Sequence, residues 1–326
     1  MAVNHVNLSN GEELIDLRHD TVTKDVLFKG YTAHGADGEP IVGEYEAESD
    51  VIASGSCGEN AIWTFYNDGR FVVSGSGKAV ATDEYSSIKN DIMTVIFEDG
   101  ITEIGNGFGD NFENVVNILI ADSVDVIGGS FKKCYSLENI IFPNNMTSIM
   151  SYAFWMCTNL RSVMIPNGIT KVEDSAFSNC SSLKSVIFPE SLKSIEEAFG
   201  LCTSLESVVI PEGLTELGVY AFESCSSLKS VTIPKSLSFI SAGVFMNCPA
   251  LETIYYAGTK EEWDSITIEP PDEYANNDWL NQVTLCCEYD PNADTVDGWN
   301  VNVITDDSDV GNITEPTITF MYTVGG

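Results

Sequence analysis

The chain has 326 residues, of which 44% are hydrophobic, and it carries 49 acidic against 15 basic residues, a formal net charge of −34. This length allows a large core or several small domains. The excess of carboxylates argues against binding to nucleic acid or to anionic membrane surfaces, because both contacts need lysine and arginine. No run of 18 apolar residues is present, so the sequence predicts no membrane span.

The first ten residues lack the basic and apolar regions of a secretory signal peptide. We therefore expect either a cytoplasmic protein or one that reaches the outside by another route, such as cell lysis that releases a virus particle.

Residues 1–50 are expected to form a separate anchor segment. Their apolar stretches are too short to build a core of their own, so they need a partner to pack against. The residues expected to make this anchor are Leu14, Ile15, Leu17, Val26, Leu27 and Phe28. The pattern predicts a short helix or turn, then an extended hairpin around Gly35–Gly38, where Asp37-Gly38 suits the turn. A plain linker or cap is the alternative.

The middle of the chain repeats with a period of 22 or 23 residues, and six cysteines mark it: Cys134, Cys157, Cys180, Cys202, Cys225 and Cys248. Each unit contains a short strand that ends at proline, such as Ser182–Pro189. The central strand positions are Val95, Ile118, Ile140, Val163, Val186, Val208, Val231 and Ile254. A constant period of this length predicts a solenoid, because one unit cannot bury its apolar edge without its neighbours.

Each coil is expected to have three parts: the strand, a turn with an apolar anchor such as Gly168–Val172, and a tight bend built on Ala-Phe and then Cys. The phenylalanine is expected in the core, and the alanine lets neighbouring coils approach. The cysteines stack in one column, which also suggests disulfides or a metal. Small buried thiols fit the pattern better, because parallel side chains rarely reach disulfide geometry.

Alternation along the strand turns the residue after the central position outward. This predicts an outward stripe, a candidate binding surface, made of Ile96, Leu119, Ile141, Met164, Ile187, Val209, Thr232 and Tyr255. A column of Ser, Thr and Asn runs beside it. Three explanations stay open: a contact surface, the β-propensity of half-exposed positions, or cover by a neighbouring subunit or the C-terminal segment.

The C-terminal part, residues 266–326, is expected to be a cap and a β tail. Strand-like stretches cover 299–304 and 317–324, and Cys286 and Cys287 are expected in a strand. Asp306–Asp309 offers oxygen atoms for Ca²⁺ but lacks the full spacing of a calcium loop, so a solvated acidic turn is the favoured interpretation. The tail could equally be a module, a cap or an oligomer contact.

No catalytic constellation stands out. The three histidines, His5, His19 and His34, all precede the repeats, so no base of that kind activates a cysteine or serine there. No glycine-rich phosphate loop is present. We expect no enzyme activity, no cofactor and no metal.

The coils resemble the BspA-type leucine-rich repeats of bacterial surface proteins, through the Leu-x-x-Val-x-Ile-Pro strand and the Ile-x-x-x-Ala-Phe-x-x-Cys bend. The lead-in Ser54–Gly77 is similar to the β cap before such repeats, and Tyr255–Trp263 to the segment after them. The resemblance covers about residues 52–288. It implies a leucine-rich-repeat fold and, for function, adhesion or recognition.

The segment Leu14–Gly43 is similar to N-terminal segments of bacteriophage fibre and decoration proteins. Together these patterns predict a fold between α/β and mostly β: an anchor segment (1–50), a β cap (51–90), a solenoid of about eight coils (91–265) and the C-terminal part (266–326).

The expected function is a virion surface protein, on head or tail. It would bind other virion proteins through its N-terminus and a host-surface protein or glycan through its repeats, and could form a homo-oligomer. The alternatives are a bacterial cell-surface adhesin outside the cell and a purely structural capsid decoration.

Overall fold

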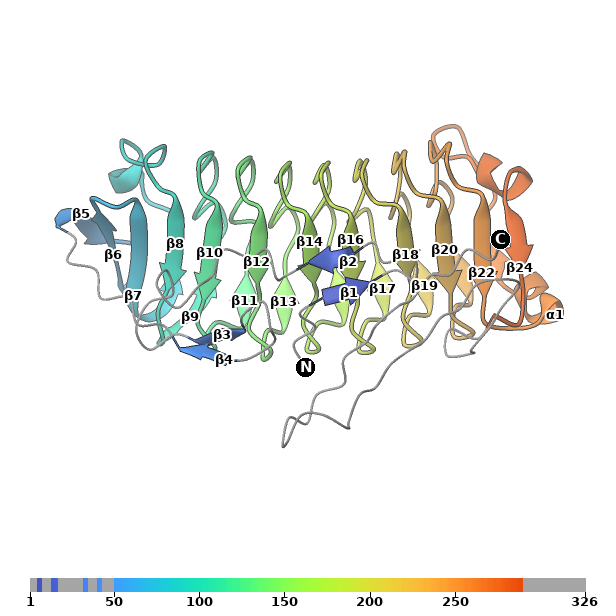
Figure 1. Ribbon diagram of the computed structural model, residues 1–326, viewed down its shortest axis with the longest axis horizontal. Helices are drawn as coiled ribbons and strands as arrows, with labels where there is room; N and C mark the ends of the chain where they lie inside the picture. The colour runs from blue at the N-terminus through green and yellow to red at the C-terminus, as the bar shows by residue number, and fades with distance from the viewer. Residues whose placement is uncertain (1–4, 8–12, 17–31, 35–39, 43–49, 290–326) are drawn as a thin grey trace. The chain divides into compact units, whose positions relative to one another are not determined.

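A computed structural model describes residues 50–289 continuously, and before them the short strands within 5–7, 13–16, 32–34 and 40–42 (Figure 1). Residues 49–288 form one compact unit, and the short strands before them belong to another. The larger unit is a mostly-β solenoid, as the repeats predict. Its described residues contain no helix that is long and apolar enough to cross a membrane.

The unit begins with an antiparallel cap of three strands, β5 (Val51–Ser56), β6 (Asn60–Tyr66) and β7 (Arg70–Ala79). Alternation along β6 buries Trp63, whose ring stacks on that of Phe71 at a centroid distance of 5.4 Å. The 3₁₀ helix η2 (Asp83–Tyr85) supplies Tyr85, whose hydroxyl donates to the Phe108 carbonyl oxygen at 2.6 Å. The cap thereby closes the end of the repeat core.

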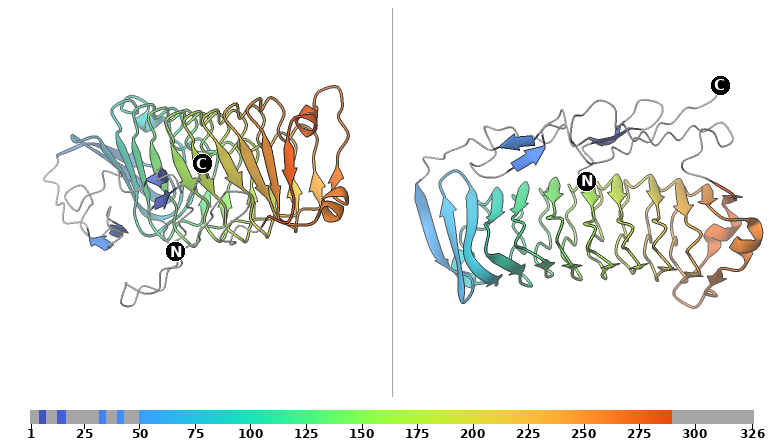
Figure 2. Two further views of the ribbon diagram at one scale, coloured as in Figure 1. Left: turned by 45° about the vertical axis from the view of Figure 1, so that its right-hand side comes forward. Right: turned by 90° about the horizontal axis from the view of Figure 1, so that it is seen from below.

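One long face of the solenoid carries one strand per coil, and its parallel pairs keep equivalent residues in register, such as Val163 beside Val186 (Figure 2). We call it the long sheet. Its first strand, β8, pairs with β7 of the cap. The strands are β8 (Thr94–Phe97), β10 (Asn117–Ile120), β12 (Asn139–Ile141), β14 (Ser162–Met164), β16 (Ser185–Ile187), β18 (Ser207–Val209), β20 (Ser230–Ile233), β22 (Thr253–Tyr256) and β24 (Thr284–Cys286).

A second, narrower sheet forms where only a turn with an apolar anchor was predicted. The anchors, Val172 and Leu217 among them, are buried as expected, but each lies in a two-residue strand paired with its neighbours. Stacking supplies hydrogen bonds that a single turn lacks. The strands are β9 (Ile101–Ile104), β11 (Val126–Ile127), β13 (Ser148–Ile149), β15 (Lys171–Val172), β17 (Ser194–Ile195), β19 (Glu216–Leu217), β21 (Phe239–Ile240) and β23 (Thr267–Ile268).

The bends carry the phenylalanine column, and its predicted burial is confirmed. Phe177 is fully buried, and its ring stacks between those of Phe154 and Phe199 at centroid distances of 5.4 and 5.5 Å. The bend backbones also form a ladder, in which the Phe154 N–H donates to the Ala176 carbonyl oxygen at 2.8 Å. The bend is tight because most coils place two residues in the left-handed region, such as Tyr152 and Met156, both with φ of 62°.

The C-terminal end is closed by helix α1 (Lys260–Asp264), the 3₁₀ helix η3 (Asp278–Asn281) and β24. Thr259 starts α1 with a capping box shared with Glu262. Trp263 of α1 packs on Tyr256, and Trp279 of η3 covers the last phenylalanine of the column, Phe245. Polar segments with one large aromatic each therefore cover the apolar face that the last coil would expose. Cys286 lies in a strand as expected, whereas Cys287 follows it.

Before residue 49, β1 (His5–Asn7) pairs antiparallel with β2 (Glu13–Asp16), and β3 (Thr32–His34) with β4 (Pro40–Val42). The hairpin expected around 35–38 is thus confirmed by its two strands. The short helix or turn expected before that hairpin is not seen in 13–16, which is a strand with a partner, and residues 17–31 lie outside the described residues. The expected strands at 299–304 and 317–324 and the acidic turn 306–309 lie outside the described residues, as do Leu17, Val26, Leu27 and Phe28 of the expected anchor.

Candidate binding face

The outward stripe occupies the same position in each strand of the long sheet, whose hydrogen-bonded pairing is interrupted between β12 and β14 and between β16 and β18. Leu119 lies beside Ile141, Met164 beside Ile187, and Val209 beside Thr232, which in turn lies beside Tyr255. Ile141 and Val209 are the most open, with 49% and 46% of their surface exposed, and the other five from Leu119 to Tyr255 are half-buried. The structure therefore brings these residues together on one face.

Ile96 is a correction to this stripe. It occupies the same register position but is only 2% exposed, so it offers almost no contact surface. It lies between two large apolar side chains at the same level of the neighbouring strands, Val72 of the cap and Leu119.

The hydroxyl and amide column runs one position before the central residue of each strand. Most of its members, from Thr94 to Thr253, are half-buried. Ser185 is the exception at 4% exposed, and its Oγ makes no hydrogen bond to any other described residue. Because the Ser185 Oγ is itself buried, a molecule on this face cannot reach it, and the accessible hydroxyl and amide groups are those of the half-buried members of the column.

A third column, missed in the sequence, lies one position further back and is charged. It holds residues of both signs over six coils, and the ion pairs Glu138–Arg161 and Glu206–Lys229 span 3.6 and 2.6 Å between nitrogen and oxygen. The column consists of Glu138, Arg161, Lys184, Glu206, Lys229 and Glu252. Aligning the residues two before each central strand position would have revealed it. Three acids against three bases make this column neutral, within a chain of net charge −34.

The cysteine column is structural. The six thiols are buried, and each Sγ donates to a backbone carbonyl oxygen of the preceding coil over 3.1–3.4 Å. Burial raises the pKa of the Cys180 and Cys202 thiols well above its ordinary value. The nine cysteines form no disulfide. A thiol that keeps its proton and lacks access to solvent is a poor nucleophile and a poor metal ligand.

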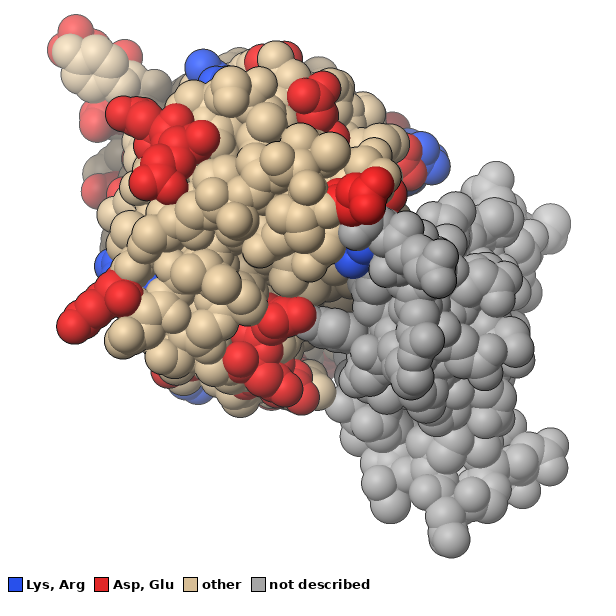
Figure 3. Space-filling view, turned by 90° about the vertical axis from the view of Figure 1, so that its left-hand side faces the viewer, with Lys and Arg blue, Asp and Glu red and all other residues tan. Residues whose placement is uncertain are grey.

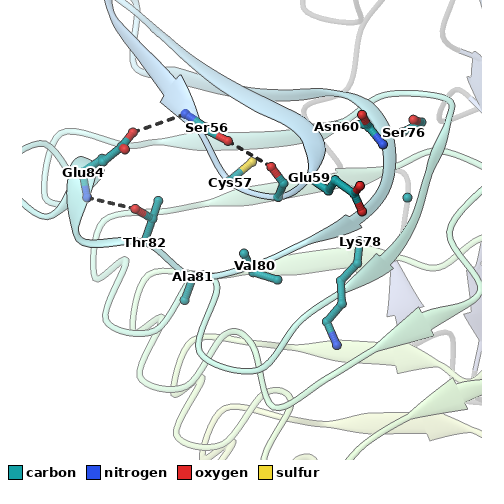
Figure 4. A pocket seen from close by; sticks show the side chains of 12 residues that line it. Ser56, Cys57, Glu59, Asn60, Ser76, Lys78, Val80, Ala81, Thr82 and Glu84 are labelled. Atoms are coloured by element: carbon teal, nitrogen blue, oxygen red, sulfur yellow. Dashed lines mark hydrogen bonds between the residues drawn. The ribbon is translucent and has the colours of Figure 1, made fainter.

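A hollow of about 540 Å³ lies beside the cap, between β5, the end of β7 and η2 (Figure 4). Glu84 accepts the backbone N–H of Ser56 at 3.2 Å, and Lys78 pairs with Glu103. Burial raises the pKa of the Cys57 thiol to about 12, so the thiol in this wall stays protonated. The charged groups at this hollow are thus partly engaged by the protein itself.

The cap end of the described unit is poor in charge. Figure 3 shows mainly uncharged side chains there, with acidic ones toward the periphery. The outward residues of β5 and β6 include the hydroxyls of Ser54, Ser56 and Thr64 and the exposed Ile62. Because β7 pairs with β8, the cap strands extend the long sheet, and these outward side chains are likewise hydroxyl-bearing or apolar.

Comparison with protein families decides what this repeat is. The family model of the BspA type leucine rich repeat region matches six copies, over residues 80–199 and 128–252. The chain belongs to this family. The BspA-type match covers more than half of the sequence and includes β8 to β21, the coils whose columns are described above.

The chain is similar to solved structures, and the likeness to one of them, with a TM-score of 0.50, shows a shared fold. A leucine-rich repeat protein from Bacteroides ovatus ATCC 8483 is 20% identical, with a TM-score of 0.50 over 75% of this chain and 79% of that one. A leucine rich cell surface protein from Faecalibacterium prausnitzii A2-165 is 18% identical, with a TM-score of 0.40 over 68% and 100% of the two chains. A leucine-rich repeat protein from Eubacterium ventriosum ATCC 27560 is 18% identical, with a TM-score of 0.46 over 64% and 73%. A search of curated proteins finds no match to the chain.

Proposed function

We propose that this BspA-type chain is a non-enzymatic adhesive surface protein that binds its target through the outward face of the long sheet. One observation carries the proposal: an apolar column, a hydroxyl and amide column and a charged column without net charge run side by side along the strands of the long sheet. Each coil thus presents a stripe residue and a hydroxyl or amide to the target, and six coils add a charged residue, which suits an extended target.

The energetics of this face favour binding. Apolar surface removed from water contributes about 25 cal/mol per Å², and the half-exposed side chains of Met164, Ile187 and Val209 have such surface left to bury. The neighbouring hydroxyls supply hydrogen bonds that give specificity. Because the flanking charged column is neutral, it neither repels an anionic target strongly nor requires one.

A catalytic role finds little support in the described residues. The histidines all lie within the first 34 residues of the sequence, and the buried thiols of the repeats keep their protons. We therefore propose binding rather than chemistry as the function of the repeats.

For the place of display, we propose the surface of a virion, attached through residues 1–50. The support is the similarity of the segment Leu14–Gly43 to fibre and decoration proteins of bacteriophages. The alternative is the surface of a bacterium, which the resemblance to bacterial surface proteins supports. Mass spectrometry of purified particles separates the two, since a virion protein co-purifies with the major capsid protein.

The attachment is tested by truncation and fusion. A protein starting at Asp50 should fold, because the cap and coils are complete in 49–288, yet should not join particles. Residues 1–50 fused to an unrelated soluble protein should carry it onto particles. If the truncated protein joins particles and the fusion does not, the anchor lies outside residues 1–50.

The binding face is tested by replacing Met164, Ile187 and Val209 together with Ser. The matched control replaces Val80, Leu201 and Leu280, which are also exposed but lie off the long sheet. Fluorescently labelled proteins are applied to a panel of whole gut bacteria and to mucin-coated plates. We expect the first variant to bind at least tenfold more weakly than the control. Both variants should have the same urea unfolding midpoint as the unchanged protein. Equal binding would refute the face and favour a purely structural decoration.

A further inference from the structure

A compact group of aromatic and basic side chains lies on the bends, away from the long sheet. We call it the aromatic–lysine patch: Lys132, Lys133, Tyr152 and Trp155. The ammonium of Lys132 lies 5.5 Å from the ring centre of Tyr152, and that of Lys133 lies 5.7 Å from the ring centre of Trp155. The two rings meet edge to face at 6.4 Å. Tyr152 is 45% exposed and Trp155 is half-buried.

The fold does not require these residue types. The bend needs the buried Ala153, Phe154 and Cys157, which recur from coil to coil. The positions of Tyr152 and Trp155 are free to vary, and the three coils that follow place there Ser175 and Ser178, Glu197 and Gly200, and Tyr220 and Glu223. A tryptophan, a tyrosine and two lysines that meet at one point are therefore an addition to the repeat, and large exposed aromatics are the residues that dominate binding sites.

The patch also reverses the local charge. Lys132 has a partner, because the Asp110 carboxylate accepts its backbone N–H at 3.0 Å and lies 3.8 Å from its ammonium. Lys133 has no carboxylate within ion-pair distance among the described residues. The bends that follow carry the acidic residues Asp174, Glu196, Glu197 and Glu223. One cation is thus available at a defined point, and acidic neighbours exclude a long polyanion on electrostatic grounds.

We infer that the aromatic–lysine patch is a second binding site, for a sugar residue that carries one carboxylate within a glycan. The polarised C–H groups of a pyranose ring pack on the part of the Trp155 or Tyr152 ring that the lysine over it leaves exposed. The carboxylate pairs with the Lys133 ammonium, which the ring beneath it keeps in place. Nearby carboxylates such as Glu173, whose Oε2 accepts the N–H and hydroxyl of Ser151, offer acceptors for sugar hydroxyls. An acidic peptide would use the lysines but would leave the two rings without a matching partner.

The experiment measures binding of the full chain to 3′-sialyllactose, trigalacturonic acid, neutral lactose and a pentaglutamate peptide, by saturation-transfer NMR and tryptophan fluorescence. We expect at least one of the two carboxylated sugars to bind, at least tenfold more tightly than lactose or the peptide. Trp155→Ala and Lys133→Gln should each weaken this binding at least tenfold. Tyr220→Ala, an aromatic at the position equivalent to Tyr152, and Lys193→Gln should not.

Lys133→Gln keeps the test informative if Trp155→Ala fails to fold. The inference is overturned if neither carboxylated sugar binds, if lactose or pentaglutamate binds as tightly, or if Lys133→Gln binds like Lys193→Gln. The inference stands apart from the long-sheet proposal, because the variant with serine at Met164, Ile187 and Val209 should keep its sugar binding.

Discussion

Replacing Phe177 by Ala tests how the solenoid is held together. The ring is fully buried and stacks between Phe154 and Phe199 with interplanar angles of 11° and 5°. Removing a buried phenylalanine costs about 3–5 kcal/mol, because the transfer energy is lost and a cavity remains. Each aromatic contact adds about 0.5–1.5 kcal/mol beyond area burial. Two stacked neighbours therefore place the expected loss of stability toward the upper end of that range.

Urea denaturation followed by far-UV circular dichroism measures this loss. Tyr274→Ala is the matched control, because this ring is 73% exposed and its loss should change the free energy of unfolding by less than about 0.5 kcal/mol. Because coils interact mainly with their neighbours, the Phe177→Ala variant should also unfold less cooperatively, through separation of the coils on either side. A loss below about 1 kcal/mol would refute the stacked core.

Three further predictions follow from buried groups. Thiol titration of the native protein should modify at most the half-buried Cys286 and Cys287, and unfolding in urea should expose all nine cysteines; ready reaction of the whole set in the native state would contradict the buried column. Burial raises the pKa values of Glu98, Asp110 and Glu197, so the folded state binds more protons than the unfolded state, and stability should rise as the pH falls from 7 toward 5; a fall in the urea midpoint over this interval would oppose it. Tyr85→Phe removes the hydroxyl that donates to Phe108 and should cost about 1–3 kcal/mol in the same urea assay, whereas no change would mean that this hydrogen bond adds nothing to the cap.

The sequence predicted the repeat architecture because its constraints recur. Each coil must bury a strand residue, a phenylalanine and a small thiol at fixed positions, so Val163, Phe154 and Cys157 could be placed in the core from spacing alone. Outward alternation was equally readable, and seven of eight residues of the predicted stripe retain exposed surface.

Other features depend on contacts between coils and were missed. The two-residue strands of the second sheet, such as Lys171–Val172, exist because neighbours supply their hydrogen bonds, which no single coil shows. Tyr152 adopts a left-handed backbone conformation, although tyrosine does not favour it. The hydrogen bonds of the bend ladder offset the cost of this conformation. Ile96 follows the stripe pattern of alternation but is only 2% exposed, which alternation along a single strand does not predict.

The assignment of binding to the long sheet is tested most directly by protection of single surface cysteines. Because the column thiols are buried, Cys286 and Cys287 can be changed to Ser and one new cysteine added, either Val209→Cys on the long sheet or Glu216→Cys on the second sheet. Each protein is bound to the whole bacteria that retain it best and then treated with a fluorescent maleimide. The proposal predicts that binding to cells slows maleimide labelling of the cysteine at position 209 at least tenfold. The labelling rate of the cysteine at position 216 should not change. Equal labelling of the two positions, or protection of 216 alone, would contradict it.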